Sequence, residues 1–276
     1  DLADSMTIDH VAQFGLGDWC PPVGVEMVDH RLSVTACYFD CLRIAGKTAA
    51  LLGDKAAAGQ YAAQMREVKA GFNRAFYQGN GVYANGGMTA LGTALYFDLC
   101  EPGEKQKVVA ELVALAEKGK CKALFGILGA KYVPRVLADN GYADLALDFF
   151  LQEEYPGWAN WVNRGATTLW EIWEGVSSRN HIMFGDVSAW FYRYIGGFRH
   201  DPERPGSRFL FVEPKALKKL AHAQVEYRGY RSEWKIEKNV FTHTLTVPAG
   251  CKATLVLPDG TAFDCQAGEM TKCCRV

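Results

Sequence analysis

The segment Trp158–His181 reads WANWVNRGATTLWEIWEGVSSRNH and is the most informative part of the chain. More than half of the chain's seven tryptophans fall within it, around the carboxylate of Glu171: Trp158, Trp161, Trp170 and Trp173. Indole faces beside a carboxylate suit a sugar site, because the C–H faces of a pyranose stack on indoles and its hydroxyls need polar partners. Two structural alternatives stay open on this pattern alone. The tryptophans can belong to the core, and Thr168-x-x-Glu171 fits a helix capping box.

The residues on both sides of this segment favour helices. Small and apolar residues recur at helical spacing from Leu32 to Leu52, and Gly53 is a suitable stop. Asp54 is placed to cap a second helix that runs to about Phe76. Further helices are expected over 88–100, 104–118, 126–139, 142–152, 166–174 and 186–196. Short loops between consecutive helices predict antiparallel helical hairpins, without substantial sheet before residue 190.

The pattern changes near residue 200. The charged stretch 199–206 contains two prolines, as linkers do. Beyond it, strands are expected over 209–212, 224–231, 232–238, 240–247 and 253–257. Residues 241–247 alternate between apolar or histidine side chains and threonines, and Pro258-Asp259-Gly260 predicts a turn. The chain is therefore expected to hold a helical domain over 1–200 and a small antiparallel β-sandwich over 207–276.

Composition limits the class of protein. With 276 residues, 49% of them hydrophobic, the chain can bury one large core and a small second one. The net charge of −1 gives no reason to expect nucleic acid or a membrane as partner, and no apolar run or signal peptide is apparent. The nine cysteines and six histidines show neither a disulfide framework nor a metal-binding spacing, so no metal or cofactor is expected. Free thiols favour a reducing compartment and leave cytoplasm and periplasm open.

Several motifs follow one another in a fixed order along the chain. They are GDWCPP (17–22), SVTACYF (33–39), FGILGAKYVPRVLADNG (125–141), YPGW (155–158), GATTLWEIW (165–173), NH (180–181) and GDVSAW (185–190). Together they resemble the signature of the bacterial alpha-L-rhamnosidases of glycoside hydrolase family 78. Matching segments run from about residue 15 to about residue 235, which is most of the chain.

The resemblance implies a fold and a reaction. The family's catalytic domain is an (alpha/alpha)6 toroid of twelve helices followed by a β domain, and only eight or nine helices are expected here before residue 200. The chain is therefore expected to form the C-terminal portion of a toroid, to associate with the missing N-terminal part, and to expose an apolar edge where the missing helices would pack. Family members hydrolyse terminal alpha-L-rhamnosyl residues with inversion, and Glu171 matches their general base.

The general acid of the family lies in an acidic motif upstream of the GDW segment. Residues 1–16 do not match that motif, and three acids there have the spacing of surface residues: Asp1, Asp4 and Asp9. The chain alone is therefore expected to be a poor hydrolase. If it proves active, Asp18 and Glu26 are the first candidates for the acid.

Substrate contacts are expected from residues in the matched motifs: Trp158, Trp170, Trp173, His181, Asp18 and Trp19. If residues 166–174 form a helix, Trp170 and Trp173 share a face from which Glu171 points about 100° away, which favours Trp158 as the sugar platform. A helix start would also keep Glu171 ionised. Arg164 and Glu174 are interpreted as a surface pair.

Two other functions remain open at this point. One is a non-catalytic carbohydrate-binding module that keeps the aromatic residues but lacks the acid. The other is a different toroid enzyme, such as a lyase or an unsaturated uronyl hydrolase, which would need a basic residue for a uronate carboxylate, and only Arg164 stands near the signature. For the main hypothesis the substrate is a rhamnose-containing glycoside or polysaccharide.

Overall fold

The structure is a computed structural model that describes residues 6–276, and it divides into two compact units. The first unit ends at Phe184 and the second is Gly185–Val276. The acids Asp1 and Asp4 lie outside the described residues. No helix among the described residues has both the length and the apolar content that a membrane span requires.

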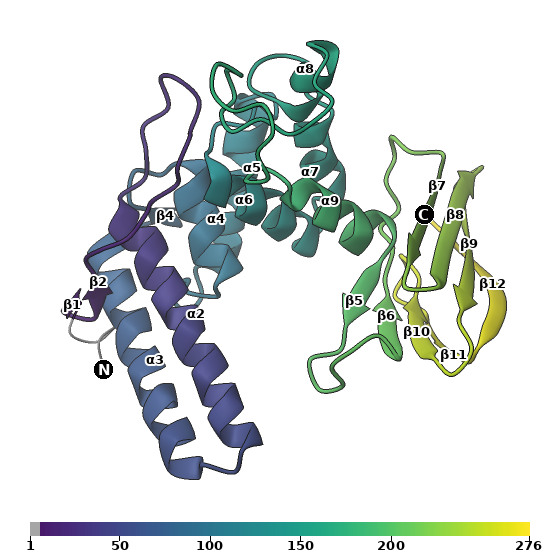
Figure 1. The fold of residues 1–276 in the computed structure, drawn as a ribbon, viewed down its shortest axis with the longest axis horizontal. Helices are drawn as coiled ribbons and strands as arrows, with labels where there is room; N and C mark the ends of the chain where they lie inside the picture. The colour runs from purple at the N-terminus through teal and green to yellow at the C-terminus, as the bar shows by residue number, and fades with distance from the viewer. Residues whose placement is uncertain (1–5) are drawn as a thin grey trace. The chain divides into compact units, whose positions relative to one another are not determined.

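Helices dominate the first unit, as the sequence predicts (Figure 1). They are α2 (His30–Leu51), α3 (Lys55–Phe76), α4 (Met88–Tyr96), α5 (Lys105–Lys118), α6 (Ile127–Asp139), α7 (Ala143–Phe150) and α8 (Trp158–Asn163). The strands described before residue 190 are two or three residues long: β1 (Thr7–Ile8), β2 (Val11–Ala12), β3 (Tyr77–Gly79) and β4 (Val82–Tyr83). Helices α2 and α3 lie side by side and antiparallel, so the predicted hairpin is confirmed. Its apolar stripes are buried, with Leu32 and Phe72 fully enclosed.

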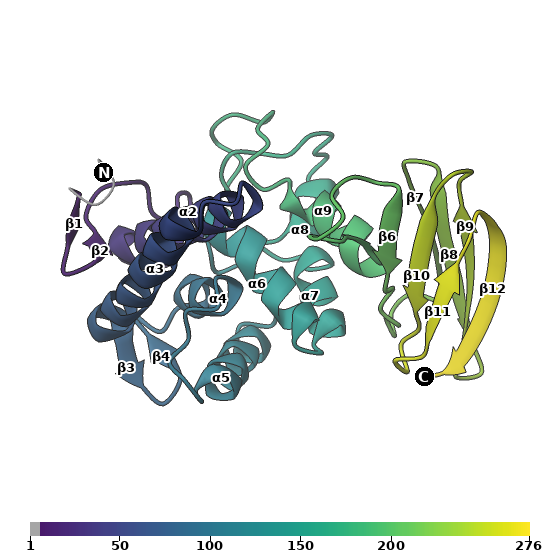
Figure 2. The same ribbon diagram turned by 90° about the horizontal axis from the view of Figure 1, so that it is seen from below.

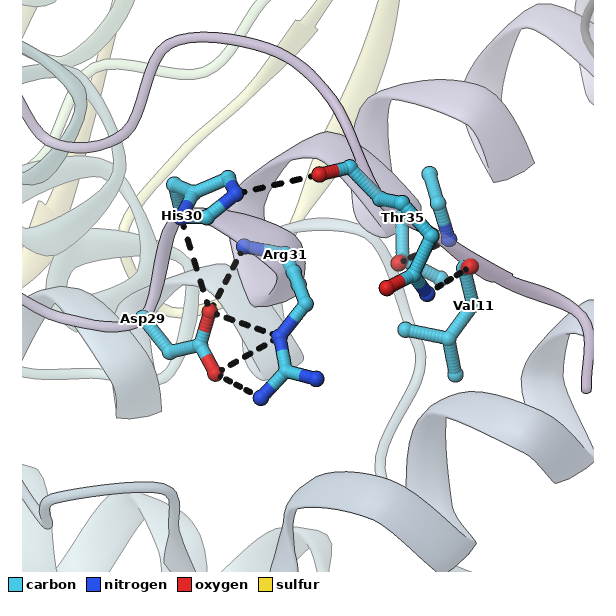
Figure 3. Close-up of polar contacts among 7 residues, drawn as sticks. Val11, Asp29, His30, Arg31 and Thr35 are labelled. Atoms are coloured by element: carbon cyan, nitrogen blue, oxygen red, sulfur yellow. Dashed lines mark hydrogen bonds and ion pairs between the residues drawn. The ribbon is translucent and has the colours of Figure 1, made fainter. Parts of the chain in front are cut away.

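Side-chain caps fix where the two long helices begin. The carboxylate of Asp29 accepts a hydrogen bond of 2.9 Å from the backbone N–H of Arg31, and the Arg31 guanidinium pairs with the same carboxylate (Figure 3). The backbone N–H of Ala12 donates to the hydroxyl of Thr35, which ties β2 to α2. Asp54 caps α3 through a 2.9 Å hydrogen bond from the N–H of Ala57, as its position predicts.

The helix expected over residues 166–174 is absent, and this prediction is wrong. The segment between α8 and Phe184 is a loop whose backbone bonds run across it: Glu171 N–H donates to the Ser178 carbonyl at 2.9 Å, and His181 N–H donates to the Leu169 carbonyl at 2.9 Å. Gly175 has a φ of +71°, a left-handed conformation that interrupts a helix and favours glycine. A side chain there would also collide with the Trp170 ring.

The second unit begins with a short helical segment. The helix expected over 186–196 appears as α9 (Asp186–Trp190) followed by a π-helical turn, η1 (Phe191–Ile195). The carbonyl of Ile195 accepts a hydrogen bond from the Trp234 indole at 2.8 Å. This bond anchors η1 to the strands that follow.

Two four-stranded sheets make up the rest of the second unit (Figure 2). The strands are β5 (Phe198–His200), β6 (Phe209–Val212), β7 (His222–Tyr227), β8 (Tyr230–Glu237), β9 (Val240–Val247), β10 (Lys252–Val256), β11 (Ala262–Cys265) and β12 (Gly268–Arg275). One sheet has the order β11-β10-β6-β5 and the other β12-β9-β8-β7. All pairs are antiparallel except β6 with β10, which is parallel and departs from the all-antiparallel expectation.

Alternation along β9 sets the face that the sheet buries. Phe241, His243, Leu245 and Val247 are buried while the threonines between them are partly exposed, as the period of two predicts. The turn at Pro258–Gly260 is also confirmed, with Gly260 at a φ of +86°. Strands β11 and β12 are not predicted from the sequence, because polar side chains and cysteines hide the alternation there. The strands expected over 224–231 and 232–238 are instead β7 and β8, because a turn at Arg228–Gly229, where both residues have a positive φ, divides the first of them.

Candidate active site

An aromatic cluster underlies the signature loop, Arg164–Phe184. The Trp173 ring lies 4.9 Å from Trp158, 4.8 Å from Trp161 and 4.4 Å from Phe184, measured between ring centres. The indole N–H groups bond to backbone carbonyls, that of Trp158 to Phe184 at 3.2 Å and that of Trp161 to Trp173 at 2.9 Å. Trp173 is 0% exposed and Trp158 is nearly buried. In this conformation the cluster supports the loop from beneath, and the predicted contacts of Trp158 and Trp173 with a sugar stay predictions.

Trp170 is also buried, but two arginine side chains contact its ring in addition to one indole. The guanidinium carbons of Arg164 and Arg179 lie 4.8 and 5.0 Å from its ring centre, and the Trp161 ring lies 5.6 Å away. Cation–π contacts of this kind hold a ring and two cations together at a surface. Its predicted contact with substrate stays a prediction as well.

Glu171 lies on the partly exposed side of the loop. Its Oε2 accepts hydrogen bonds from the Ser177 hydroxyl at 2.6 Å and from the Ser178 backbone N–H at 3.2 Å. The Ser177 bond, then the Ser178 bond, and the nearby His181 hold the pKa of Glu171 below its ordinary value against a small opposing effect of burial. The carboxylate is therefore ionised at neutral pH and available as a proton acceptor.

Both helix-based interpretations of Glu171 are wrong, because the segment is not helical. No capping box forms: the Thr168 hydroxyl donates to the carbonyl of Arg179. Ionisation of Glu171 is favoured by two local hydrogen bonds and not by a helix N-terminus. The argument that Trp170 and Trp173 share a helix face from which Glu171 points about 100° away also fails, since it depends on a helical twist.

His181 lies close to Glu171. Its charge contributes to lowering the pKa of Glu171, and its Nδ1 accepts a weak 3.4 Å hydrogen bond from the N–H of Met183. The structure therefore brings together two of the predicted site residues, a carboxylate and an imidazole. Both side chains are only partly buried and can be reached from solvent.

Asp18 occupies a different kind of position. It is 2% exposed, and its two oxygens accept bonds from the Thr89 hydroxyl and from three backbone N–H groups at the start of α6, those of Gly126 (2.8 Å), Leu128 (2.8 Å) and Gly129 (3.1 Å). Burial raises the pKa of Asp18, and these hydrogen bonds oppose that rise without cancelling it. Asp18 thus fastens its loop to α6, and its predicted contact with substrate stays a prediction.

The neighbouring residues of that loop approach the signature loop. Trp19 is 48% exposed, while its backbone carbonyl accepts the N–H of Ile127 at 2.9 Å. Burial raises the pKa of the Cys20 thiol, and the negative charges of Glu171 and Glu174 raise it further. The Gly17–Pro22 motif therefore lies beside the loop that carries Glu171, with Trp19 as its exposed aromatic side chain.

Glu174 joins these two loops, a role that the sequence did not reveal. Its Oε1 accepts the backbone N–H of Val23 at 3.0 Å and the hydroxyl of Tyr155. Burial opposes ionisation of Glu174, but the hydrogen bonds from Tyr155 and Val23 outweigh it and hold its pKa below the ordinary value. The expected surface pair of Glu174 with Arg164 is wrong, because Arg164 donates to the backbone carbonyl of Glu174 at 2.8 Å. The YPGW motif was the available signal, since it contains Tyr155.

The histidine, cysteine and acidic side chains are the ones whose grouping could hold a metal ion. Within residues 6–276 no group of three or more histidine, cysteine, aspartate or glutamate side chains is arranged to hold a metal ion.

Comparison with known proteins decides the family. A model of the bacterial alpha-L-rhamnosidase 6 hairpin glycosidase domain matches residues 2–195, and a model of the bacterial alpha-L-rhamnosidase C-terminal domain matches residues 197–271. The chain belongs to the bacterial alpha-L-rhamnosidase family. The resemblance inferred from the motifs is therefore confirmed.

Curated relatives agree with the family models. An alpha-L-rhamnosidase from Alteromonas sp. (strain LOR) is 28% identical over 267 residues, which cover 88% of this chain and 29% of the relative. One from Formosa agariphila is 28% identical over 272 residues, covering 91% of this chain and 29% of the relative. The chain thus spans less than a third of the length of these relatives.

Solved structures show the same fold. The alpha-L-rhamnosidase of Streptomyces avermitilis complexed with L-rhamnose has a TM-score of 0.89 at 23% identity, over 99% of this chain and 29% of that chain. The alpha-L-rhamnosidase of Dictyoglumus thermophilum has a TM-score of 0.88 at 26% identity, over 97% and 35% of the two chains. The prediction of toroid helices followed by a β domain is confirmed.

Proposed function

We propose that this chain supplies the base-bearing part of an enzyme that hydrolyses terminal alpha-L-rhamnosyl residues with inversion of configuration. The observation that carries the proposal is the geometry of Glu171. Both hydrogen bonds to its carboxylate end on Oε2, so among the described residues Oε1 has no partner. An ionised carboxylate that is fixed through one oxygen and free at the other is well prepared to take a proton from water.

The proposed reaction uses opposite faces of the sugar ring. Glu171 removes a proton from a water molecule as that water attacks the anomeric carbon, and a carboxylic acid on the other face protonates the departing oxygen. His181 lies beside Glu171 and can bond a sugar hydroxyl, while the exposed indole of Trp19 offers an apolar surface for the ring. The Streptomyces avermitilis enzyme, which shares this fold, was solved in complex with L-rhamnose, and this supports rhamnose as the sugar.

The general acid must be protonated when the substrate binds. Glu174 does not suit this role, because hydrogen bonds from Tyr155 and Val23 favour its ionised form. Asp18 has a raised pKa but is enclosed by its four donors. We therefore propose that the acid comes from another part of the toroid.

Exposed apolar side chains support a packing site for that part in the loop before α2. Besides Trp19, four apolar side chains of this loop are exposed, and the most exposed of them, Val23, is 81% exposed. The four are Phe14, Leu16, Val23 and Met27. Apolar side chains gathered in one exposed segment are typical of an interface. We propose that the remaining helices of the toroid cover these four side chains.

The stereochemistry of the product tests the proposal. Proton NMR of the first turnovers of an aryl alpha-L-rhamnoside by the full-length enzyme should show the beta anomer of rhamnose before mutarotation. First release of the alpha anomer would contradict inversion, and no cleavage at all would contradict the proposed activity. A carbohydrate-binding module would bind the rhamnoside and leave it intact.

A further inference from the structure

The signature loop contains four charged side chains that do not pair with one another. The carboxylates of Glu171 and Glu174 accept from neutral donors, a serine and a tyrosine hydroxyl and two backbone N–H groups. The two arginines of the loop donate to neutral backbone carbonyls, Arg164 to Glu174 at 2.8 Å and Arg179 to Gly175 at 3.0 Å. Among the described residues neither guanidinium is part of an ion pair. The loop therefore presents two positive charges that no acidic side chain neutralises.

Both guanidinium groups stack on one indole. The guanidinium carbons of Arg164 and Arg179 lie 4.8 and 5.0 Å from the ring centre of Trp170, the residue directly before Glu171. Both arginine side chains are exposed to solvent, while the indole on which they stack is buried. A guanidinium carries five N–H donors in a planar fork, and only one donor of each has a bond described above. The remaining donors are available to an oxyanion from solvent.

The backbone fixes this pair relative to the proposed base. The carbonyl of Arg179 accepts the Thr168 hydroxyl, and the preceding residue, Ser178, donates its N–H to Glu171. A ligand anion on the arginines would therefore contact the same loop that carries Glu171.

We propose that Arg164 and Arg179 form a subsite for an anionic sugar unit, carrying a carboxylate or a sulfate, in the glycoside that binds at Glu171. This inference rests on the proposed function, because it assigns a substrate class to the same site. A carboxylate or sulfate presents two or more oxygens in the geometry that a guanidinium fork bonds in pairs. With a neutral rhamnoside bound, the free donors of both guanidinium groups would bond only to water.

Calorimetric titration of the full-length protein carrying Glu171→Gln tests the subsite without turnover. The ligands are a rhamnosyl-uronic acid disaccharide, its neutral methyl ester, methyl rhamnoside and a sulfated methyl rhamnoside. At low salt the uronic acid should bind about tenfold tighter than its ester. This ratio corresponds to the weak end of the range for charge-assisted hydrogen bonds, because the site is exposed. This preference should shrink as salt is added. A preference for the sulfated rhamnoside over methyl rhamnoside, without one for the uronic acid over its ester, would identify sulfate as the anion.

Substitutions assign the preference to the two arginines. Arg164→Gln and Arg179→Gln should each lower the ratio of anionic to neutral affinity severalfold, and the Lys variants at both positions should retain part of it. Arg66→Gln, which removes an exposed positive charge from α3, should leave the ratio unchanged. Equal binding of anionic and neutral ligands by the unsubstituted arginines, or a ratio that survives both Gln substitutions, would overturn the proposal. Hydrolysis of the ligand in the Glu171→Gln protein would instead count against the base assignment.

Discussion

Replacing Asp18 should cost stability and leave sugar affinity nearly intact. The carboxylate is buried and accepts one hydroxyl and three backbone N–H groups that no helical bond satisfies at the start of α6. Asp18→Ala leaves these donors without an acceptor, and each buried unsatisfied donor costs about 1–3 kcal/mol, partly recovered by water. We expect a loss of roughly 3–5 kcal/mol in the free energy of unfolding, which is large beside a typical total of about 5–15 kcal/mol.

Asp18→Asn separates shape from charge. The asparagine amide keeps one accepting oxygen, but its NH2 group faces N–H or O–H donors that then have no acceptor. We therefore expect a loss of about 2 kcal/mol in the free energy of unfolding. Urea unfolding followed by tryptophan fluorescence measures the loss, and Asp9→Asn, at an exposed position, is the matched control. Rhamnose affinity of the folded variant should stay within about twofold of the parent. A variant with unchanged unfolding but much weaker rhamnose binding would refute the structural role and restore Asp18 as a substrate contact.

Three further predictions follow from the site and the β domain. Ser177→Ala removes the first of the two bonds that lower the pKa of Glu171, so the acidic limb of the kcat/KM profile should move to higher pH, and an unmoved limb would remove Ser177 from this role. Glu174→Ala and Tyr155→Phe each remove one shared hydrogen bond between loops, so each should lower kcat/KM about three- to tenfold. The double variant should be no worse than the poorer single one, and additive losses would show independent roles. Burial lowers the pKa of His243 from an ordinary 6.5 to about 4. The stability that the neutral imidazole contributes is therefore fully present above pH 6.5 and is lost as the pH falls toward 4, by up to about 3 kcal/mol. His243→Leu should flatten this pH dependence in urea unfolding, and an unchanged dependence would assign it to other groups.

The helices were predictable where local chemistry determines them. Asp54 caps α3 through a residue three positions on, and the apolar stripe of α2 has the spacing of one helical face, so both ends of the hairpin are visible in the sequence. The loop at 166–174 was not predictable in this way. Its backbone bonds join residues seven and twelve positions apart. Gly175 takes a left-handed conformation, and the packed Trp170 ring leaves no room for a side chain there.

The site was predictable in its motif but not in its contacts. The family signature located Glu171 and His181, which the structure brings together. The partners of Glu171 follow it in the chain but depend on the loop's path, and Asp18 caps a helix 108 residues away in sequence. Such long-range hydrogen bonds carry no periodicity, so a buried cap and an exposed substrate contact look alike in one sequence.

The assignment of Glu171 as the general base is tested most directly by chemical rescue. In the full-length enzyme Glu171→Gly should lower kcat on an aryl rhamnoside by roughly 10²–10⁴-fold, because the attacking water loses its proton acceptor. Azide needs no base, since it attacks without losing a proton, so it should restore turnover and yield the beta-rhamnosyl azide. Glu153→Gly, at an exposed position before α8, should keep its activity and show no azide product. A loss below tenfold in Glu171→Gly, or an alpha-configured azide product, would contradict the account.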